Sequence, residues 1–326
     1  MMKKPVLIIL LIFMFLAAAC SPQNSTTLQG VPGTVIVSNG SSGTVVQINA
    51  VSGSSQPPVK VGNGPTQVVV SSTGLVAYVV DTKGSQLFRF NPLTQQAKSP
   101  FKLPNNPIEF QLSPADNFIN GYALVQGSNQ LIEINMFSGK VVSSISVGQS
   151  PTSFAISKSG VLAFVTDSST NTLNVVDLLT KQIKFAIPVD DDPSAIALTP
   201  NGGTALVVCT LSDDVVPVNL NTFKSEPHII TGPLPSHIIV DPQKSSAFVS
   251  WEDGEFITPI NLIKNIANAP IDVKGVVKGM AVSNDGLNLY LAESNPNRVL
   301  VIPTYLKGTT FSVSLPFTPT GIASGS

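Results

Sequence analysis

The stretch LVAYVVDTKGSQLFRF, residues 75–90, consists of two runs rich in apolar and β-branched residues around a polar tip. This pattern predicts a β-hairpin whose strands are joined at DTKGS. Similar stretches follow at residues 122–134, 162–176 and 289–302, and their tips differ in sequence. The chain therefore repeats one hairpin, in which the strands are alike and the tips vary.

A proline precedes a short apolar strand at regular intervals along the chain. The intervals are 42, 44, 42, 42, 42 and 42 residues, with valine once in place of proline, and they separate Pro65, Pro107, Pro151, Pro193, Pro235, Val277 and Pro319. Each interval holds four strand-like segments separated by turns such as SSTG or PNGG. Units of about 40 residues with four strands are typical of β-propeller blades.

The two ends of the repeat region complement each other. The segment TVIVSNGSSGTVVQI, from Thr34, matches the second and third strands of a blade and lacks a first strand, whereas PTGIAS at Pro319 is a first strand without the others. Pairing the two segments would leave no open sheet edge. We therefore expect an all-β fold over residues 34–326: a seven-bladed β-propeller of four-stranded blades, closed by a C-terminal strand that completes the first blade.

Two of the hairpins carry a recognisable signature. The segments AYVVDTKGSQLFRFNPLT and AFVTDSSTNTLNVVDLLT resemble the YVTN-type repeat, with residues 78–81 and 164–167 at the signature positions. The resemblance covers nearly all of residues 34–326. It implies a propeller of the lactonase-like superfamily, whose members include surface proteins, binding scaffolds and lactonase-like enzymes, so it predicts fold more strongly than function.

The first residues predict export. A basic start, MMKK, precedes an apolar run of about fifteen residues and three alanines, which is the layout of a signal peptide over residues 1–19. Cys20 follows directly and resembles the lipidated cysteine of a bacterial lipobox, although Ala17 stands where that motif prefers leucine. Residues 20–33 would then be a flexible tether, and the protein a membrane-anchored lipoprotein of the bacterial cell envelope. Ordinary cleavage near Ala19 is the alternative.

Composition limits the classes of partner. The chain has 326 residues, 43% hydrophobic and 11% charged, with a formal net charge of −1. Nothing in it suggests a nucleic-acid surface, which is strongly basic. The second of the two cysteines, Cys209, lies in an apolar strand and is expected to be a buried hydrophobic residue.

Acidic residues concentrate in the predicted tips between second and third strands and in the crossings before each proline. We call the end of the ring that carries these loops the top face, and eleven of the 19 acids fall there: Asp81, Asp167, Asp190, Asp191, Asp192, Asp213, Asp214, Glu252, Asp253, Glu255 and Glu293. The tether before Thr34 would leave from the opposite face. An acidic face suits a cationic partner.

The densest carboxylates are Asp190, Asp191 and Asp192, with Asp213 and Asp214. Clustered carboxylates are the oxygen ligands that calcium requires, so calcium is the one cofactor considered for this chain. No EF-hand pattern is present, and a solvated acidic rim is the alternative interpretation. His228 is expected on the surface of an outer strand.

Gln67, Glu109 and His237 share one position, two residues after the proline, where the other blades have Ser, Ala or Gly. This position faces the central channel in the predicted fold, so these three residues form either a small-molecule site or a hydrated channel lining. Trp251, the only tryptophan, lies at a tip. It would contact a sugar or peptide ligand or pack against a neighbouring blade.

Two functions follow from these residues. The favoured one is a lipid-anchored scaffold that binds a cationic, protein or glycan partner through the acidic top face, because binding residues gather on loops held by a rigid frame. The alternative is a lactonase-like hydrolase at the upper channel mouth, with Glu109 and His237 as catalytic candidates and Arg298 for charge stabilisation. No G-x-S-x-G or HExxH motif and no paired CxxC supports another enzyme class.

Overall fold

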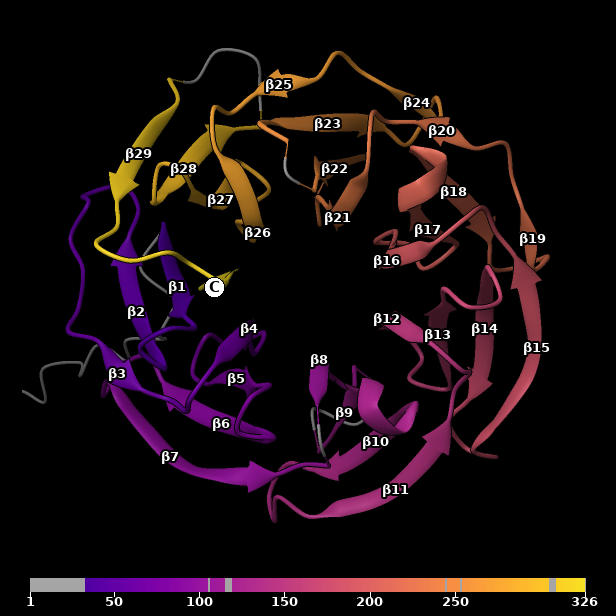
Figure 1. Ribbon diagram of the computed structural model, residues 1–326, viewed down its shortest axis with the longest axis horizontal. Helices are drawn as coiled ribbons and strands as arrows, with labels where there is room; N and C mark the ends of the chain where they lie inside the picture. Colours follow the sequence, from indigo (N-terminus) through magenta and orange to yellow (C-terminus); the bar gives the residue numbers. More distant parts are fainter. Residues whose placement is uncertain are drawn as a thin grey trace, which may run out of the picture.

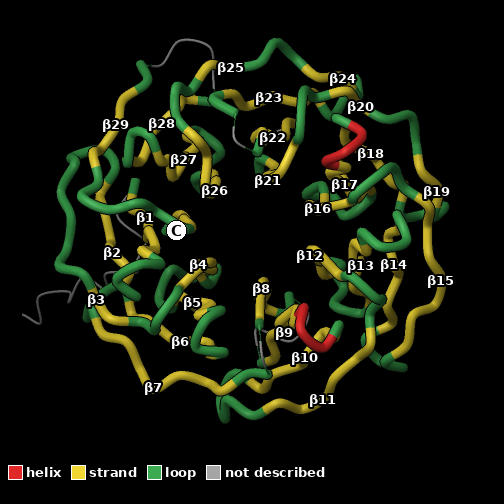
Figure 2. The backbone as a smooth tube through the Cα atoms, viewed as in Figure 1, coloured by secondary structure: helices red, strands yellow, loops and turns green. Residues whose placement is uncertain are grey.

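The computed structural model describes residues 33–104, 106–114, 119–243, 245–252, 254–304 and 309–325. These residues form a ring of seven antiparallel sheets around a central channel (Figures 1 and 2). Two single-turn 3₁₀ helices, η1 (Gln126–Ser128) and η2 (Thr210–Ser212), occupy hairpin tips. No helix in the described ranges has the length and hydropathy of a membrane span. The predicted signal peptide and Cys20 lie outside the described residues.

Each blade contains four successive strand positions, counted outward from the channel. The innermost strands are β4 (Pro65–Val70), β8 (Pro107–Leu112), β12 (Pro151–Ile156), β16 (Pro193–Leu198), β21 (Pro235–Val240), β26 (Val276–Val282) and β30 (Gly321–Ser324). The second strands are β1 (Thr34–Asn39), β5 (Ala77–Asp81), β9 (Asn120–Val125), β13 (Leu162–Asp167), β17 (Thr204–Cys209), β22 (Ser246–Trp251) and β27 (Asn288–Ser294).

The third strands are β2 (Thr44–Asn49), β6 (Gln86–Asn91), β10 (Gln130–Asn135), β14 (Thr172–Asp177), β18 (Asp214–Asn219), β23 (Phe256–Asn261) and β28 (Arg298–Pro303). The outer position is held by β3 (Val59–Lys60), β7 (Gln96–Lys102), β11 (Val141–Ser146), β15 (Gln182–Pro188), β19 (Lys224–Ser225) with β20 (Ile229–Ile230), β24 (Ile266–Ala267) with β25 (Ile271–Asp272), and β29 (Phe311–Ser314). Blade 1 is β30-β1-β2-β3, and blades 2 to 7 follow in chain order.

The C-terminal strand closes the ring as predicted. β30 pairs antiparallel with β1, so that Val35 faces Ser324 and Ser38 faces Gly321. The hydroxyl of Thr320 also donates a hydrogen bond to the carbonyl of Pro65, 2.7 Å away, at the start of blade 2. The tail is thus joined both to blade 1 and to its neighbour.

The hydrophobic core is divided among the blade interfaces. Seven clusters of buried apolar side chains lie each between two adjacent blades. At the closing interface Val37 of blade 1 packs with Tyr290 and Val299 of blade 7. Cys209 is fully buried between blades 4 and 5, which confirms its expected role as a small hydrophobic residue, and burial raises the pKa of its thiol. Each sheet therefore buries both faces only inside the closed ring.

The innermost strands share one irregularity. Pro65 pairs with Asp81 and Gln67 with Val80, so Thr66 between them has no partner in the ladder. The same β-bulge follows Pro107, Pro151, Pro193, Pro235 and Val277. A bulge inserts one residue and changes the direction of the side chains beside it. It therefore decides which residues of each repeat face the channel.

Candidate functional site

The channel contains a polar cavity of about 410 Å³. Two consecutive residues of each innermost segment line it. In blades 2 to 7 they are the unpaired residue of the bulge and the residue after it, and in blade 1 they are the residues at the start of β30: Thr66 and Gln67, Ile108 and Glu109, Thr152 and Ser153, Ser194 and Ala195, Ser236 and His237, Lys278 and Gly279, Thr320 and Gly321. Gln67, Glu109 and His237 thus all line this cavity, and their role in ligand binding stays a prediction. The preceding position, which includes Lys278, was not predicted, because the bulge leaves no signal in the hydrophobic pattern.

Gln67 and Glu109 join neighbouring blades. The side-chain oxygen of Gln67 accepts a hydrogen bond from the backbone N–H of Phe110 at 2.7 Å. One repeat later, Oε2 of Glu109 accepts from the N–H of Phe154 at 3.1 Å and from the hydroxyl of Ser153 at 2.8 Å. The same repeat position thus makes the same bond to the next blade. Both side chains have a structural role in the channel wall.

Glu109 has little remaining freedom to act as a general base. Its Oε1 accepts a third hydrogen bond, from Nε2 of Gln111 at 3.0 Å. Burial raises the pKa of Glu109, and the bonds from Gln111, Ser153 and Phe154 oppose that rise. A general base must be within hydrogen-bond reach of a substrate proton, and both oxygens of this carboxylate already accept hydrogen bonds from the protein.

Hydroxyl groups also form hydrogen bonds across the interfaces between neighbouring blades, which we call seams. At four of the seams between described blades, a threonine hydroxyl donates to the carbonyl of the proline that opens the next blade. The donors and acceptors are Thr320 to Pro65, Thr82 to Pro107, Thr152 to Pro193 and Thr210 to Pro235. Part of the polar lining, including Thr152 and Thr320, therefore helps to hold the ring.

Lys278 and His237 remain available to a ligand. Both side chains line the cavity and are exposed to it. Nδ1 of His237 lies 3.1 Å from the hydroxyl of Ser236 and 3.3 Å from that of Ser250. Desolvation by the channel wall lowers the pKa of His237, and the charge of Lys278 lowers it further, which favours the neutral imidazole. Within the described part of the chain, Lys278 has no hydrogen-bond or ion-pair partner.

The side chain of Trp251 makes internal contacts. Its indole N–H donates to the hydroxyl of Thr258 at 3.1 Å, and its ring centroid lies 5.0 Å from that of Phe256. A Cβ at Gly232, in the crossing between β20 and β21, would lie 2.1 Å from the indole ring. The indole therefore packs closely on this crossing. This geometry favours the packing interpretation over a ligand contact.

Several acids of the top face are buried and serve to fix loops. Asp81 accepts from the backbone N–H groups of Asn63, Gly64 and Gly84 at 2.8–3.1 Å, which ties the crossing before blade 2 to a hairpin tip. In blade 4, Asp167 likewise accepts from the backbone N–H groups of two crossing residues and one tip residue. Each of these two acids ends the second strand of its blade and so connects the hairpin tip to the crossing before the same blade.

Glu293 holds the equivalent position in blade 7 and is fully buried. Its Oε2 accepts from Nε of Arg298 at 2.6 Å, and Arg298 also donates to the carbonyl of Val273. Arg298 is thus bound at the top of blade 7 and is not part of the channel lining. Among the described top-face acids, Asp191, Asp213, Glu252 and Glu255 are exposed, whereas Asp190 and Asp192 are half-buried and the others buried, so the face is less acidic than the sequence suggests.

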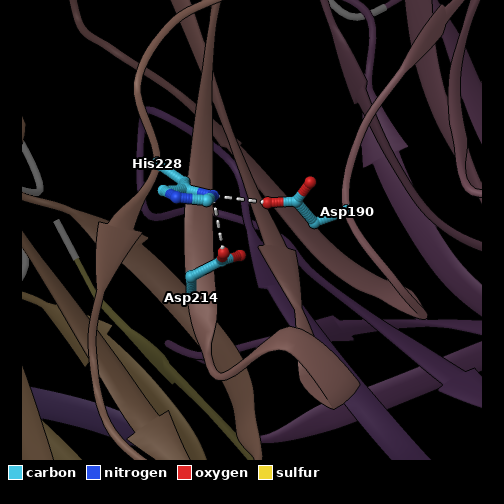
Figure 3. A group of neighbouring side chains, drawn as sticks. All are labelled: Asp190, Asp214 and His228. Atoms are coloured by element: carbon cyan, nitrogen blue, oxygen red, sulfur yellow. Dashed lines mark hydrogen bonds and ion pairs between the residues drawn. The ribbon is translucent and has the colours of Figure 1, made fainter.

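Two of the predicted cation ligands meet a residue that was not predicted with them. Asp190 lies in the crossing from β15 to β16, Asp214 begins β18, and His228 lies between β19 and β20. Nδ1 of His228 is 2.7 Å from Oδ2 of Asp190 and 3.2 Å from Oδ2 of Asp214 (Figure 3). The ring nitrogen and the two carboxylates can hold a metal ion, since one donor atom from each lies within 4.8 Å of the others.

The electrostatics of this group reflect the two adjacent carboxylates. Burial and the neighbouring Asp190 raise the pKa of Asp214 to about 7, against the opposing effect of His228. The hydrogen bond from His228 lowers the pKa of Asp190, and Asp190 in turn raises the pKa of His228. The group carries more negative than positive charge when both carboxyls are ionised.

The other predicted cation ligands do not join this group. Asp191 accepts a hydrogen bond from the side chain of Asn171 at 2.7 Å, and Asp213 accepts from the backbone N–H of Leu234 at 2.9 Å. Asp192 and Asp213 both adopt left-handed backbone conformations, with φ of 56° and 60°. The five carboxylates therefore do not form one oxygen-rich calcium cage.

Comparison with known proteins identifies the fold. No family model matches the chain, so the YVTN resemblance stays a prediction, and no curated protein matches it in sequence. Among solved structures it is similar to a protein of unknown function from Desulfotomaculum acetoxidans, with a TM-score of 0.77 and 14% identity over 89% of this chain and 98% of that chain.

Two further similar structures belong to different kinds of protein. A candidate 6-phosphogluconolactonase from Bacteroides uniformis has a TM-score of 0.72 and 14% identity, covering 89% of this chain and 98% of that chain. A chain of the hydrazine synthase of Kuenenia stuttgartiensis has a TM-score of 0.70 and 15% identity, covering 80% of this chain and 89% of that chain. At such identities the likeness shows a shared propeller fold.

Proposed function

We propose that the protein is an exported, lipid-anchored binding propeller of the bacterial cell envelope that takes a small polar ligand with an acidic group into its central channel. The observation that carries this proposal is Lys278, a cation exposed in a cavity of about 410 Å³ with no partner among the described residues. The neutral His237 beside it offers a further hydrogen-bonding group. Ligand sites of this kind combine a preformed cavity with a few placed polar groups.

Binding is favoured over hydrolysis because two of the three residues considered for catalysis, Glu109 and Arg298, already have partners within the protein. Glu109 accepts three hydrogen bonds within the wall, and Arg298 is paired with Glu293. The similarity to a candidate lactonase, at 14% identity, concerns the fold. A cationic partner on the top face is a separate proposal. The four exposed acids of that face support it, but the burial of Asp81, Asp167 and Glu293 weakens it.

The orientation of the chain is consistent with an anchor at residue 20. β1 runs from Thr34 to the tip at Asn39, and that tip corresponds to the tips that carry Asp81 and Asp167. Thr34 therefore lies at the opposite end of its blade. A tether that reaches a membrane from Thr34 would leave the top face directed away from the lipid surface.

Calorimetry against a panel of small carboxylates, sulfonates and organic phosphates, each with its uncharged amide or alcohol, tests the binding proposal. We expect an acid of the panel to bind the wild type and to bind Lys278→Met at least about tenfold more weakly, a loss of about 1.4 kcal/mol. The matched control is Lys102→Met, at an exposed lysine of the outer strand β7.

Two results would contradict the proposal. If the uncharged analogues bound as tightly as the acids, the charge of Lys278 would have no role in binding. Hydrolysis of a lactone panel by the wild type, lost in both Glu109→Gln and His237→Ala, would show an enzyme instead of a binding protein.

A further inference from the structure

We propose that Asp190, Asp214 and His228 bind a divalent transition-metal ion, with zinc as the best-fitting ion, at the outer top edge of the seam between blades 4 and 5. The three side chains come from different segments of the chain and point toward one another (Figure 3). This site is separate from the channel, since none of its residues lines the channel cavity.

The distances between the donor atoms suit zinc. Zinc bonds to histidine nitrogen and carboxylate oxygen at about 2.0–2.2 Å, which places tetrahedral ligand atoms about 3.4 Å apart. Nδ1 of His228 already lies 2.7 Å and 3.2 Å from the two carboxylate oxygens. The nitrogen of His228 is therefore already close to the spacing that zinc requires from each of the two carboxylate oxygens.

The buried carboxylate of Asp214 lacks the donors that comparable acids have. Its side chain is 2% exposed, and its Oδ1 has no hydrogen-bond partner among the described residues. Asp81 and Asp167, buried on the same face, are each held by at least three backbone N–H groups. An unsatisfied buried carboxylate is costly, and a cation would neutralise it.

The site is open on one side. The side chains of His228 and Asp190 are 58% and 39% exposed, and a hollow of about 370 Å³ adjoins them, lined also by Ser225 and Glu226. Three protein donors and an open position are the arrangement in which zinc keeps a water molecule. Calcium is less suitable, because it requires six to eight oxygen ligands and one of the three donors here is an imidazole nitrogen.

The experiment uses the full chain, purified in detergent and stripped with EDTA, and titrates it with ZnCl₂ in a calorimeter. We expect one zinc ion per chain and binding at least about tenfold weaker in His228→Ala and in Asp190→Asn. The matched controls are His237→Ala, the other histidine, and Glu252→Gln, an exposed acid of the same face; both should bind zinc as the wild type does.

A second measurement does not depend on the stability of any variant. Co²⁺ added to the stripped wild type should give the visible absorption of a tetrahedral site, and one equivalent of zinc should remove it. Zinc should also raise the melting temperature of the wild type and leave that of His228→Ala unchanged.

The proposal is overturned if zinc neither binds the stripped protein nor changes its melting temperature, which would leave His228 as an ion-pair partner only. It is overturned equally if His228→Ala binds zinc with wild-type affinity, or if calcium binds the three residues as tightly as zinc. None of these outcomes bears on ligand binding at Lys278, so the two proposals fail or stand separately.

Discussion

At the residue scale, the acids of the repeat act through the backbone donors that they satisfy. Asp167 is 1% exposed and accepts hydrogen bonds from the N–H groups of Gln149, Ser150 and Ser169 and from the hydroxyl of Ser169. Burial by itself would raise the pKa of Asp167, but these bonds outweigh it and hold the pKa below its usual value. The ionised form is therefore the one that stabilises the loop.

Asp167→Asn should lower the free energy of unfolding at pH 7 by about 1.5–3 kcal/mol, because the variant loses charge-assisted hydrogen bonds and faces N–H donors with an amide N–H₂. The folded-state pKa lies below the unfolded value, so the contribution is full above the unfolded pKa and is lost as the pH falls through the folded pKa. Urea unfolding at several pH values should show the difference between variant and wild type shrinking in acid. Glu252→Gln, which removes an exposed carboxylate, should show neither effect.

At the element scale, the bulged innermost strands create both the seams and the cavity. The bulge aligns Gln67 and Glu109 with the backbone of the following blade and adds the preceding residue of each repeat to the channel lining. The hydrogen bonds from one innermost strand to the next thus supplement the apolar contacts between blades.

Gln67→Ala should lower the free energy of unfolding by about 1–2 kcal/mol, since the N–H of Phe110, a fully buried residue, would lose its acceptor. Gln67→Glu should retain most of the stability, because Glu109 makes the same kind of bond to Phe154. Gln149→Ala removes an exposed glutamine side chain and is the control. Equal unfolding midpoints for Gln67→Ala and Gln149→Ala in urea would contradict this assignment.

At the scale of the whole molecule, closure makes every blade depend on its neighbours. The core consists of interfaces between blades, and the last of them forms when β30 pairs with β1 and Val37 packs against Tyr290. Thr34 at the start of β1 lies at the end of its blade opposite the top face, which is the geometry that an anchored protein would need to present its top face to solvent.

Cys20→Ser should release the protein from the membrane fraction into the soluble fraction when the full precursor is expressed in a bacterium, because the proposed acyl chains would be attached through this thiol. Mass spectrometry of the mature amino-terminal peptide checks the same prediction and should show a lipidated Cys20 in the wild type. An unmodified terminal cysteine in the wild type would instead support ordinary cleavage near Ala19.

Much of the fold could be predicted from the sequence because a propeller repeats a local pattern. The regular prolines, the apolar alternation and the complementary ends at Thr34 and Pro319 predicted seven blades and their closure, and the structure has both. The pattern also predicted that Gln67, Glu109 and His237 share a channel position. It could not reveal that Gln67 and Glu109 bond to the next blade, since that depends on the approach of two strands about 43–45 residues apart in the chain.

The sequence by itself determined the blades, because the alternation of buried and exposed positions along a strand can be recognised from neighbouring residues. Only the tertiary structure decided which side chains meet across blades and loops. Lys278 faces the cavity because of a backbone bulge, and His228 meets Asp190 across 38 positions of chain because the outer strand of blade 5 is interrupted between β19 and β20. Such contacts arise from the three-dimensional path of the backbone. A periodic hydrophobic pattern in the sequence does not specify that path.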